Sequence, residues 1–348
     1  MRPPKTTFPP FAPAKPRQFS SATEDLVSVA PLFPGSSLPL VYRPKTKDLA
    51  FMDWLRDHRH QINRDLLQAG AILFRGFPIA TPLVFQDFAS GICPGLFRQY
   101  GDLPRENDVI YKVTPYPHED TILFHNESSH MGSWPMKQFF YCHVPAQAGG
   151  ETPIVDCRQI YRSLAPEWVT RFETLGLKYT RNFIPGLDVR WEDFFRTENR
   201  EKVEEHCRLN GWAFRWKSGG QLSIQQHSPA VAAHPVTGEK VFFNQIQLHH
   251  IAFLKPHIRL SLLEMVREEN LPRNVYLGDG SPLPDDLVLG IEKLYWDHAV
   301  DFSWQAGDVL LVDNMLIAHG RKPYQPPRKM NVAMGEMRHQ KIPEGVSP

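Results

Sequence analysis

The sequence predicts a mainly β protein, with a jelly-roll or sandwich core and flanking α-helices. From about residue 100 onward, short runs rich in Ile, Val, Phe and Tyr are separated by Pro and Gly, which is typical of strands joined by loops. Helical stretches interrupt these runs without a regular alternation of strand and helix, which argues against a parallel α/β sheet. The 348 residues, 42% of them hydrophobic, provide enough apolar material for a sizeable core.

Ten of the 32 prolines fall within the first 44 residues. Proline fixes φ and lacks the backbone N–H, so a proline-dense segment does not form a regular helix or a central strand. We therefore predict an extended arm over residues 1–44, followed by a single domain over 45–348.

The hydrophobic pattern along 45–348 predicts the elements of this domain in order. Apolar residues recur at three- and four-residue steps over 47–69, which predicts a helix that ends at Gly70. A buried strand is expected over 71–77 and a short helix over 81–92. Further strands are expected over 109–114, 121–125, 138–144, 240–245 and 308–312. Further helices are expected over 158–165, 166–175, 192–209 and 256–268, which predicts a helical insert across about 158–270.

Charge and composition exclude several classes of partner. With 39 basic and 38 acidic residues the formal net charge is +1, whereas nucleic acids and acidic membrane surfaces are bound by a concentrated basic excess. No apolar run approaches the ~20 residues of a membrane-spanning helix. The four cysteines contain no CxxC pair. We therefore expect a cytoplasmic protein that acts on a small molecule, with no nucleic-acid or membrane partner.

Two segments carry residues suited to metal chemistry. His125 and Glu127 are two positions apart on an expected strand, so both side chains would project from the same face. A second apolar strand over 308–312 is followed by a turn and a short apolar run that ends in His319. Two histidines and one carboxylate form the facial triad of non-haem Fe(II) oxygenases. Among 15 histidines such a spacing can also arise by chance, so a zinc hydrolase or a non-catalytic jelly-roll binding protein remain alternatives.

Longer stretches around these residues resemble the taurine dioxygenase-like (TauD/TfdA) family of Fe(II)/2-oxoglutarate oxygenases. The resemblance is carried by residues 124–130, 145–156 and 313–321, with further likeness at 70–77, 234–239 and 242–245. These stretches follow one another in order over roughly 65–335. The resemblance implies a double-stranded β-helix (jelly-roll) fold, an Fe(II) cofactor, and 2-oxoglutarate and O2 as co-substrates.

The resemblance also implies roles for individual residues. His125, Glu127 and His319 would bind the iron. Thr152 and Arg328 would hold the far carboxylate of 2-oxoglutarate, although Arg328 follows His319 a little earlier than in most relatives, which keeps the neighbouring Lys329 as an alternative. Some relatives bind an acidic substrate through a second arginine four positions further on. Val332 and Ala333 occupy the matching positions here, so binding of a sulfonate in that manner is not expected.

Four residues are candidates for substrate contact, each with a structural alternative. Arg321 would either meet the substrate or brace the loop after His319. Asn244 and Gln245 would either line the pocket or be buried amides that form structural hydrogen bonds in a sheet. Lys112 would either meet a substrate carboxylate or carrier phosphate, or lie on a solvated strand face. We expect His130 to be structural and the pair His249–His250 to lie at the surface.

Within the family the chain looks most similar to members with Glu in the first metal motif. Several of these hydroxylate amino acids, free or bound to a peptidyl carrier protein, in nonribosomal peptide pathways. The resemblance therefore implies hydroxylation of an aliphatic C–H bond in secondary metabolism, with succinate and CO2 as co-products, and desaturation as the alternative outcome.

Overall fold

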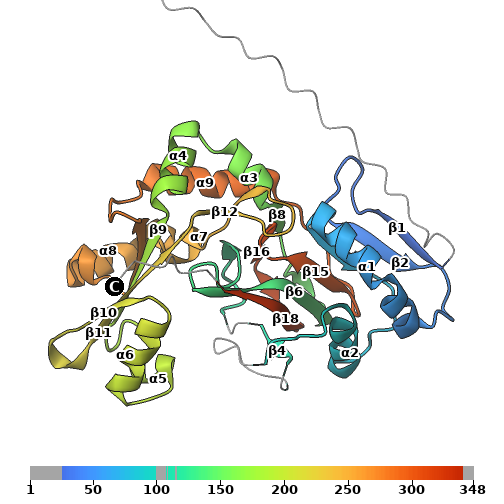
Figure 1. Cartoon of the computed structure of the whole chain (residues 1–348), viewed down its shortest axis with the longest axis horizontal. Helices are drawn as coiled ribbons and strands as arrows, with labels where there is room; N and C mark the ends of the chain where they lie inside the picture. The colour runs from blue at the N-terminus through green and yellow to red at the C-terminus, as the bar shows by residue number, and fades with distance from the viewer. Residues whose placement is uncertain (1–25, 99–106, 108, 114–115, 340–348) are drawn as a thin grey trace, which may run out of the picture.

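A seven-stranded sheet extends from the middle of the protein to the edge that carries β1 and β2 (Figure 1), in a computed structural model that describes residues 26–98, 107, 109–113 and 116–339. Its strand order is β1-β2-β3-β15-β6-β18-β4. Only β2 and β3 pair in parallel, and the other neighbours are antiparallel. The strands are β1 (Val27–Pro31), β2 (Leu40–Pro44), β3 (Ala71–Phe74), β4 (Tyr111–Lys112), β6 (Ser133–Val144), β15 (Val309–Asp313) and β18 (Lys329–His339).

Smaller sheets complete the jelly roll. One has the order β5-β16-β8 and the other pairs β17 with β7. Side chains of the large sheet, such as Phe140 and Leu310, share one buried core with Ile154 and Ile317 of the smaller sheet. The predicted jelly-roll class is confirmed. The strands are β5 (Ile122–His125), β7 (Ala148–Gly149), β8 (Ile154–Asp156), β16 (Ile317–Arg321) and β17 (Tyr324–Gln325).

Two helices cover the opposite face of the large sheet. Because side chains alternate along a strand, Leu73 joins the core between the sheets, whereas Ile72 and Phe74 contact the helices. Burial on both faces explains why 71–74 is continuously apolar. The helices are α1 (Phe51–Ala69) and α2 (Pro82–Ile92); they confirm the predicted helices, although α1 begins four residues later than expected.

The expected proline-rich arm is wrong for residues 27–44. These residues form β1 and β2, and β2 lies inside the sheet between β1 and β3. The prolines mark the boundaries of the strands: Pro31 ends β1, Pro39 precedes β2 and Pro44 ends it. Because these prolines stand at strand ends, they do not interrupt the hydrogen bonds between the strands. The first 25 residues of the expected arm lie outside the described residues.

The segment after β8 is also less helical than expected. It contains a four-stranded sheet of order β10-β11-β9-β14, the insert sheet, and a β12-β13 hairpin. In Leu222–Ser228 the burial alternates with a period of two from Ile224 onward, although four polar residues in succession hide this strand pattern from the sequence. The strands are β9 (Leu177–Phe183), β10 (Ala213–Trp216), β11 (Leu222–Ser228), β12 (Val231–Ala233), β13 (Lys240–Phe242) and β14 (Arg273–Leu277).

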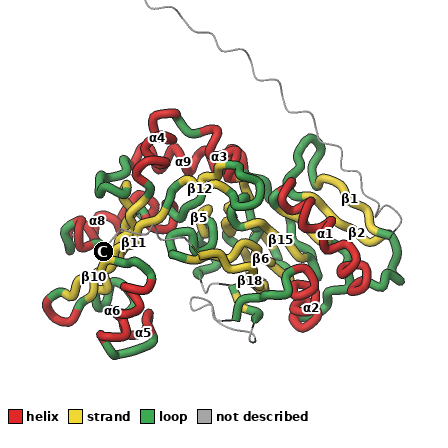
Figure 2. The backbone as a smooth tube through the Cα atoms, in the orientation of Figure 1, coloured by secondary structure: helices red, strands yellow, loops and turns green. Residues whose placement is uncertain are grey.

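Helices lie at the periphery of this segment, whereas strands run through the centre of the molecule (Figure 2). The expected helix over 192–209 is divided into two at Arg196, which has a left-handed backbone conformation. Among the described residues, no helix is long and apolar enough to cross a membrane. The helices are α3 (Cys157–Ser163), α4 (Pro166–Leu175), α5 (Trp191–Phe195), α6 (Arg200–Leu209), α7 (Ile246–His249), α8 (Pro256–Met265) and α9 (Asp285–His298).

Candidate metal centre and co-substrate site

Two histidines and one glutamate meet where β5 and β16 pair. His125 lies directly opposite His319 in the antiparallel register of the two strands. One potential ligand atom from each of His125, Glu127 and His319 lies within 4.8 Å of the other two. The structure thus brings together three residues whose sequence separation reaches 194 positions.

Glu127 does not reach this cluster in the way that strand periodicity predicts. Strand β5 ends at His125, so Glu127 lies in the turn that follows. The side chain of Asn314 fixes it there: Glu127 N–H donates to Asn314 Oδ1 (2.7 Å), and Asn314 Nδ2 donates to Glu127 O (2.9 Å). Sequence reasoning assigned Asn314 only to a turn and missed this contact.

The turn that carries Asn314 is itself supported by a buried pair. Asp313 Oδ1 accepts the backbone N–H groups of Met315 and Leu316. His234 Nδ1 accepts two backbone N–H groups, so its Nε2 carries the hydrogen and donates to Asp313 Oδ2 at 3.1 Å. The 234–239 segment therefore contributes to the site by bracing the turn between β15 and β16.

The state of both histidines suits a metal ion. His125 Nδ1 lies 2.9 Å from Leu123 O, and because a carbonyl only accepts, Nδ1 carries the hydrogen and Nε2 has the lone pair. His319 is buried, and its Nδ1 has no hydrogen-bond partner among the described residues. Burial, and then the neighbouring His125, lower the pKa of His319 well below its ordinary value. The imidazole is therefore neutral near pH 7, which is the form that binds metals.

Thr152 and Arg328 each follow, by three residues, one of the two paired strands β7 and β17. Thr152 is buried, and its Oγ1 accepts a hydrogen bond from Trp304 Nε1 (3.2 Å), which leaves the hydroxyl hydrogen to donate elsewhere. Arg328 Nε donates to Gly150 O (3.1 Å). Burial, and then Arg321, lower the pKa of Arg328 to about 10, so the guanidinium is still charged at neutral pH. Sequence reasoning missed Trp304.

The two basic candidates after His319 differ in exposure. Arg328 is partly buried and its guanidinium lies over the ring of Tyr324, whereas Lys329 is exposed at the start of β18. A partly buried cation whose Nε is already oriented is the better partner for a carboxylate. The positions of Val332 and Ala333 are buried and apolar, so β18 presents no second guanidinium there.

Three of the four substrate candidates make structural contacts, and the fourth lies exposed on an edge strand. Arg321 donates to the carbonyl oxygens of three loop residues: Tyr116, Pro117 and Asp120. Gln245 Nε2 donates to Asn126 O, and the backbone N–H of Asn244 donates to Asn126 Oδ1. Lys112 is exposed on the edge strand β4. Arg321 thus braces a loop, whereas Gln245 through its side chain and Asn244 through its backbone hold Asn126, the residue before Glu127.

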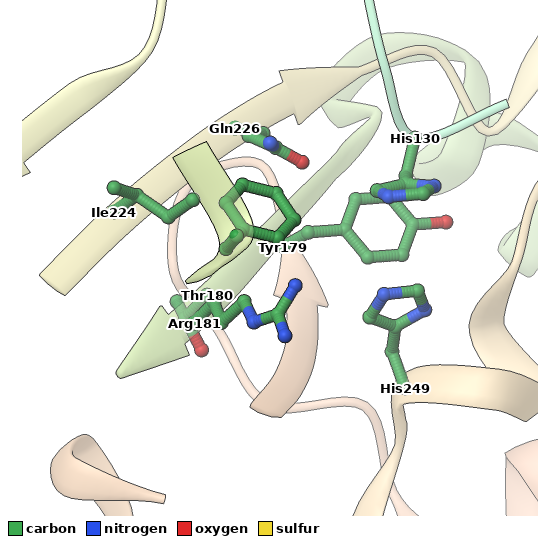
Figure 3. Close-up of a pocket in the computed structure, with 8 residues that line it drawn as sticks. His130, Tyr179, Thr180, Arg181, Ile224, Gln226 and His249 are labelled. Atoms are coloured by element: carbon green, nitrogen blue, oxygen red, sulfur yellow. The ribbon is translucent and has the colours of Figure 1, made fainter. Parts of the chain in front are cut away.

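The expectation that His249 and His250 lie at the surface is wrong. His250 is buried and bonded to Leu283 O, and the ring of His249 packs against His130 at 4.8 Å between centroids. His130 and His249 both line a cavity with Tyr179 (Figure 3). The local sequence pattern gave no indication of this, because the three residues come from separate segments.

A jelly roll with a cluster of two histidines and one carboxylate defines the class of non-haem metal oxygenases. The sequence matches the taurine catabolism dioxygenase TauD, TfdA family over residues 34–334. It is 35% identical over 310 residues to the dapdiamide synthesis protein DdaC of Enterobacter agglomerans, covering 88% of this chain and 94% of DdaC. It is 30% identical over 311 residues to a clavaminate synthase-like protein of Arabidopsis thaliana, covering 85% and 90% of the two chains. The chain therefore belongs to the TauD/TfdA family.

Solved structures show the same fold. PvcB, described as an Fe, α-ketoglutarate dependent oxygenase from an isonitrile synthetic pathway, matches with a TM-score of 0.57 at 11% identity, covering 94% of this chain and 98% of PvcB. AAD-2, solved with Mn(II) and N-oxalylglycine, matches with a TM-score of 0.50 at 16% identity, covering 91% and 99%. Family membership makes the chain an oxidoreductase that uses iron and 2-oxoglutarate, which decides against the zinc hydrolase and the binding protein.

Proposed function

We propose that this enzyme hydroxylates an aliphatic C–H bond of a small substrate, an amino acid that is free or bound to a carrier protein, in secondary metabolism. The observation that carries the proposal is the cluster of His125, Glu127 and His319, whose ligand atoms lie within 4.8 Å of one another. DdaC acts in dapdiamide synthesis and PvcB comes from an isonitrile pathway, which supports a biosynthetic role.

In this proposal His125, Glu127 and His319 hold Fe(II) through two neutral imidazoles and one carboxylate. The iron with 2-oxoglutarate supplies the oxidation of the C–H bond by O2, with succinate and CO2 as co-products. Asn314 keeps the backbone of Glu127 in place through its two hydrogen bonds. The carbonyl of Leu123 holds His125 in the tautomer with a free Nε2.

Thr152 and Arg328 would hold the far carboxylate of 2-oxoglutarate. The hydrogen bond from Trp304 fixes the Thr152 oxygen as an acceptor, so its hydrogen is directed to another partner. The hydrogen bond from Arg328 Nε to Gly150 O leaves the terminal amino groups of the guanidinium to approach a carboxylate as a fork. The carboxylate of Glu127 favours hydroxylation over halogenation, because related halogenases have a small residue at this position.

The proposal is tested by succinate release. Protein purified without oxygen is supplied with Fe(II), 2-oxoglutarate and a panel of amino acids, free and loaded on a carrier domain, and oxygen is then admitted. We expect oxygen-dependent succinate that at least one panel member stimulates. The Glu127→Gln variant should lose this succinate release. Glu119 is exposed, and its Glu119→Gln variant should release succinate as wild type does. Absence of succinate above an iron-free control would contradict the proposal.

The mass of the organic product separates hydroxylation from desaturation. Hydroxylation adds one oxygen atom, whereas desaturation removes two hydrogen atoms. A product that has lost two hydrogens and gained no oxygen would show that the enzyme is a desaturase and not a hydroxylase.

A further inference from the structure

Gln138 is a buried amide among apolar neighbours on the inner face of the large sheet. It lies on β6, opposite Val312 of β15 and Met334 of β18. Residues that face each other across antiparallel strands project from the same side of the sheet, and both neighbours belong to the apolar core between the sheets. Phe140, two residues further along β6, shares this side and packs against the ring of His319 at 4.9 Å between centroids. Gln138 therefore projects into the same interior as the metal cluster.

The amide nitrogen of Gln138 contacts the carboxylate of Glu127. Gln138 Nε2 donates to Glu127 Oε2 at 3.4 Å. Only this orientation of the amide is favourable, because a carboxylate accepts hydrogen bonds and a reversed amide would present its own oxygen to it. A contact to one carboxylate oxygen restricts the rotation of the carboxylate about its last bond. It thereby also sets the direction of the other oxygen.

Gln138 contributes little to the stability of the fold. The residue is 2% exposed, and its Oε1 is buried with no hydrogen-bond partner among the described residues. A buried polar atom without a partner lowers stability, and the contact with Glu127 is longer than the usual range of about 2.7–3.2 Å. An apolar side chain of similar size would fit these surroundings better. An amide at this position is therefore explained by the metal site and not by packing.

The backbone and the side chain of Glu127 are held by different residues. Asn314 fixes the backbone through two hydrogen bonds, and its own backbone N–H donates to Met136 O of β6 at 2.9 Å. Gln138 follows Met136 by two residues and lies on the same face of β6. The strand that is joined to this turn through Asn314 therefore also provides the donor for the carboxylate.

We propose that Gln138 is a positioning residue, which binds Oε2 of Glu127 and so directs the carboxylate toward the metal. The inference rests on the proposed function, because it requires Glu127 to be a metal ligand. Removal of a residue that orients a metal ligand typically weakens metal binding about 10- to 100-fold. The long contact places Gln138 at the lower end of that range.

Binding of Mn(II) to the metal-free protein, measured by calorimetry, tests this without iron, 2-oxoglutarate or turnover. Gln138→Met keeps the length of the side chain but removes the donor, and should weaken Mn(II) binding about tenfold. Because Gln138→Met also removes the unpartnered Oε1, its Tm without metal should equal or exceed that of wild type. Gln138→Asn keeps the amide but withdraws it by one carbon atom, and should weaken Mn(II) binding similarly. An affinity equal to that of wild type in either variant would overturn the inference.

Gln226→Met is the matched control for packing. Gln226 is also a buried amide on a strand, and its Nε2 makes a similarly weak contact, at 3.8 Å, with Met131 Sδ. This variant should bind Mn(II) as wild type does. Equal losses of Mn(II) affinity in Gln138→Met and Gln226→Met would show that Gln138 acts through general packing and would contradict the inference. A loss in Gln138→Met that is accompanied by a fall in Tm below that of Gln226→Met would contradict it as well.

The two proposals fail in different ways, and Glu127→Gln distinguishes them in the same titration. If Glu127→Gln bound Mn(II) as wild type does, Glu127 would not be a ligand, and both the proposed metal cluster and the role of Gln138 would be wrong. If Glu127→Gln lost Mn(II) binding while both variants of Gln138 retained it, only the role of Gln138 would be wrong.

Discussion

Asn314 holds the backbone of Glu127 from both sides, accepting its N–H at 2.7 Å and donating to its carbonyl at 2.9 Å. The same carboxamide nitrogen donates to Pro135 O at 2.9 Å. One side chain therefore connects the turn after β15 to the turn after β5 and to β6. The placement of Glu127 depends on this contact because the residue lies beyond the end of its strand.

Replacing Asn314 by Ala should reduce both stability and iron affinity. The change leaves up to three backbone groups without their partner, at a cost of roughly 2–4 kcal/mol in the free energy of unfolding. It also releases Glu127, which should weaken Fe(II) binding about 10- to 100-fold, the range for residues that orient metal ligands. Thermal melts and anaerobic Fe(II) titration measure the two effects.

Asn182→Ala is the matched control. Asn182 is also a buried amide, but it lies on β9 and donates to Leu271 O and Glu269 O in the turn before β14. It should lose similar stability while its iron affinity stays near that of wild type. Equal loss of iron affinity in both variants would show that Asn314 acts through general stability alone.

Arg328→Gln should raise the 2-oxoglutarate concentration required for half-maximal succinate release about 10- to 100-fold, because it removes a charge-assisted contact of ~1.5–3 kcal/mol. Fe(II) binding should not change. Lys329→Gln removes a charge from the exposed neighbouring position and should have little effect. The reverse result, with Lys329→Gln affecting 2-oxoglutarate and Arg328→Gln silent, would assign the role to Lys329.

Gly150→Ala should disturb the same co-substrate contact through the backbone. Gly150 has a φ of +74°, and a Cβ there would stand 3.0 Å from the Cδ and Nε atoms of Arg328. Gly238→Ala has a similar φ of +71° with nothing within 4 Å. Both variants should lose roughly 1–2 kcal/mol from the left-handed conformation. Only Gly150→Ala should raise the 2-oxoglutarate requirement, and an equal requirement in both variants would argue against a role for this turn.

His249 should make the protein less stable in acid. The pKa of His249 is about 3 in the folded chain, below the ~6.5 of an unfolded histidine. The unfolded state then binds the additional proton, so stability falls as the pH falls from about 6.5 toward 3. His249→Gln should flatten the dependence of Tm on pH between 6.5 and 4.5. An unchanged slope would show that His249 takes up its proton without unfolding.

Parts of the fold follow from the sequence because they depend on local pattern. α1 and α2 show the helical period, and β3 is apolar throughout because both of its faces are buried. The insert sheet was mistaken for helix because its period-two strands are short and lie among helices. β1 and β2 were overlooked because a count of prolines does not show that Pro31 and Pro44 stand at strand ends.

The site residues could likewise be predicted only in part from the sequence. A short motif and a resemblance suggest His125, Glu127 and His319, and the structure brings their ligand atoms together. The contacts that position them are not local: Asn314 is 187 residues from Glu127, and His234 is 79 residues from Asp313. Whether Arg321 meets the substrate or braces a loop depended on which carbonyls lie near it, and only the fold determines that.

Anaerobic titration of the protein with Fe(II) and 2-oxoglutarate tests the central claim most directly. We expect a visible absorption band, from charge transfer between the metal and its bound keto acid, that saturates at one iron per chain. His319→Ala should abolish the band, whereas His250→Ala, which removes a buried histidine bonded to Leu283 O, should retain it. The account would be contradicted if wild type gave no band, or if His319→Ala gave the same band at the same stoichiometry.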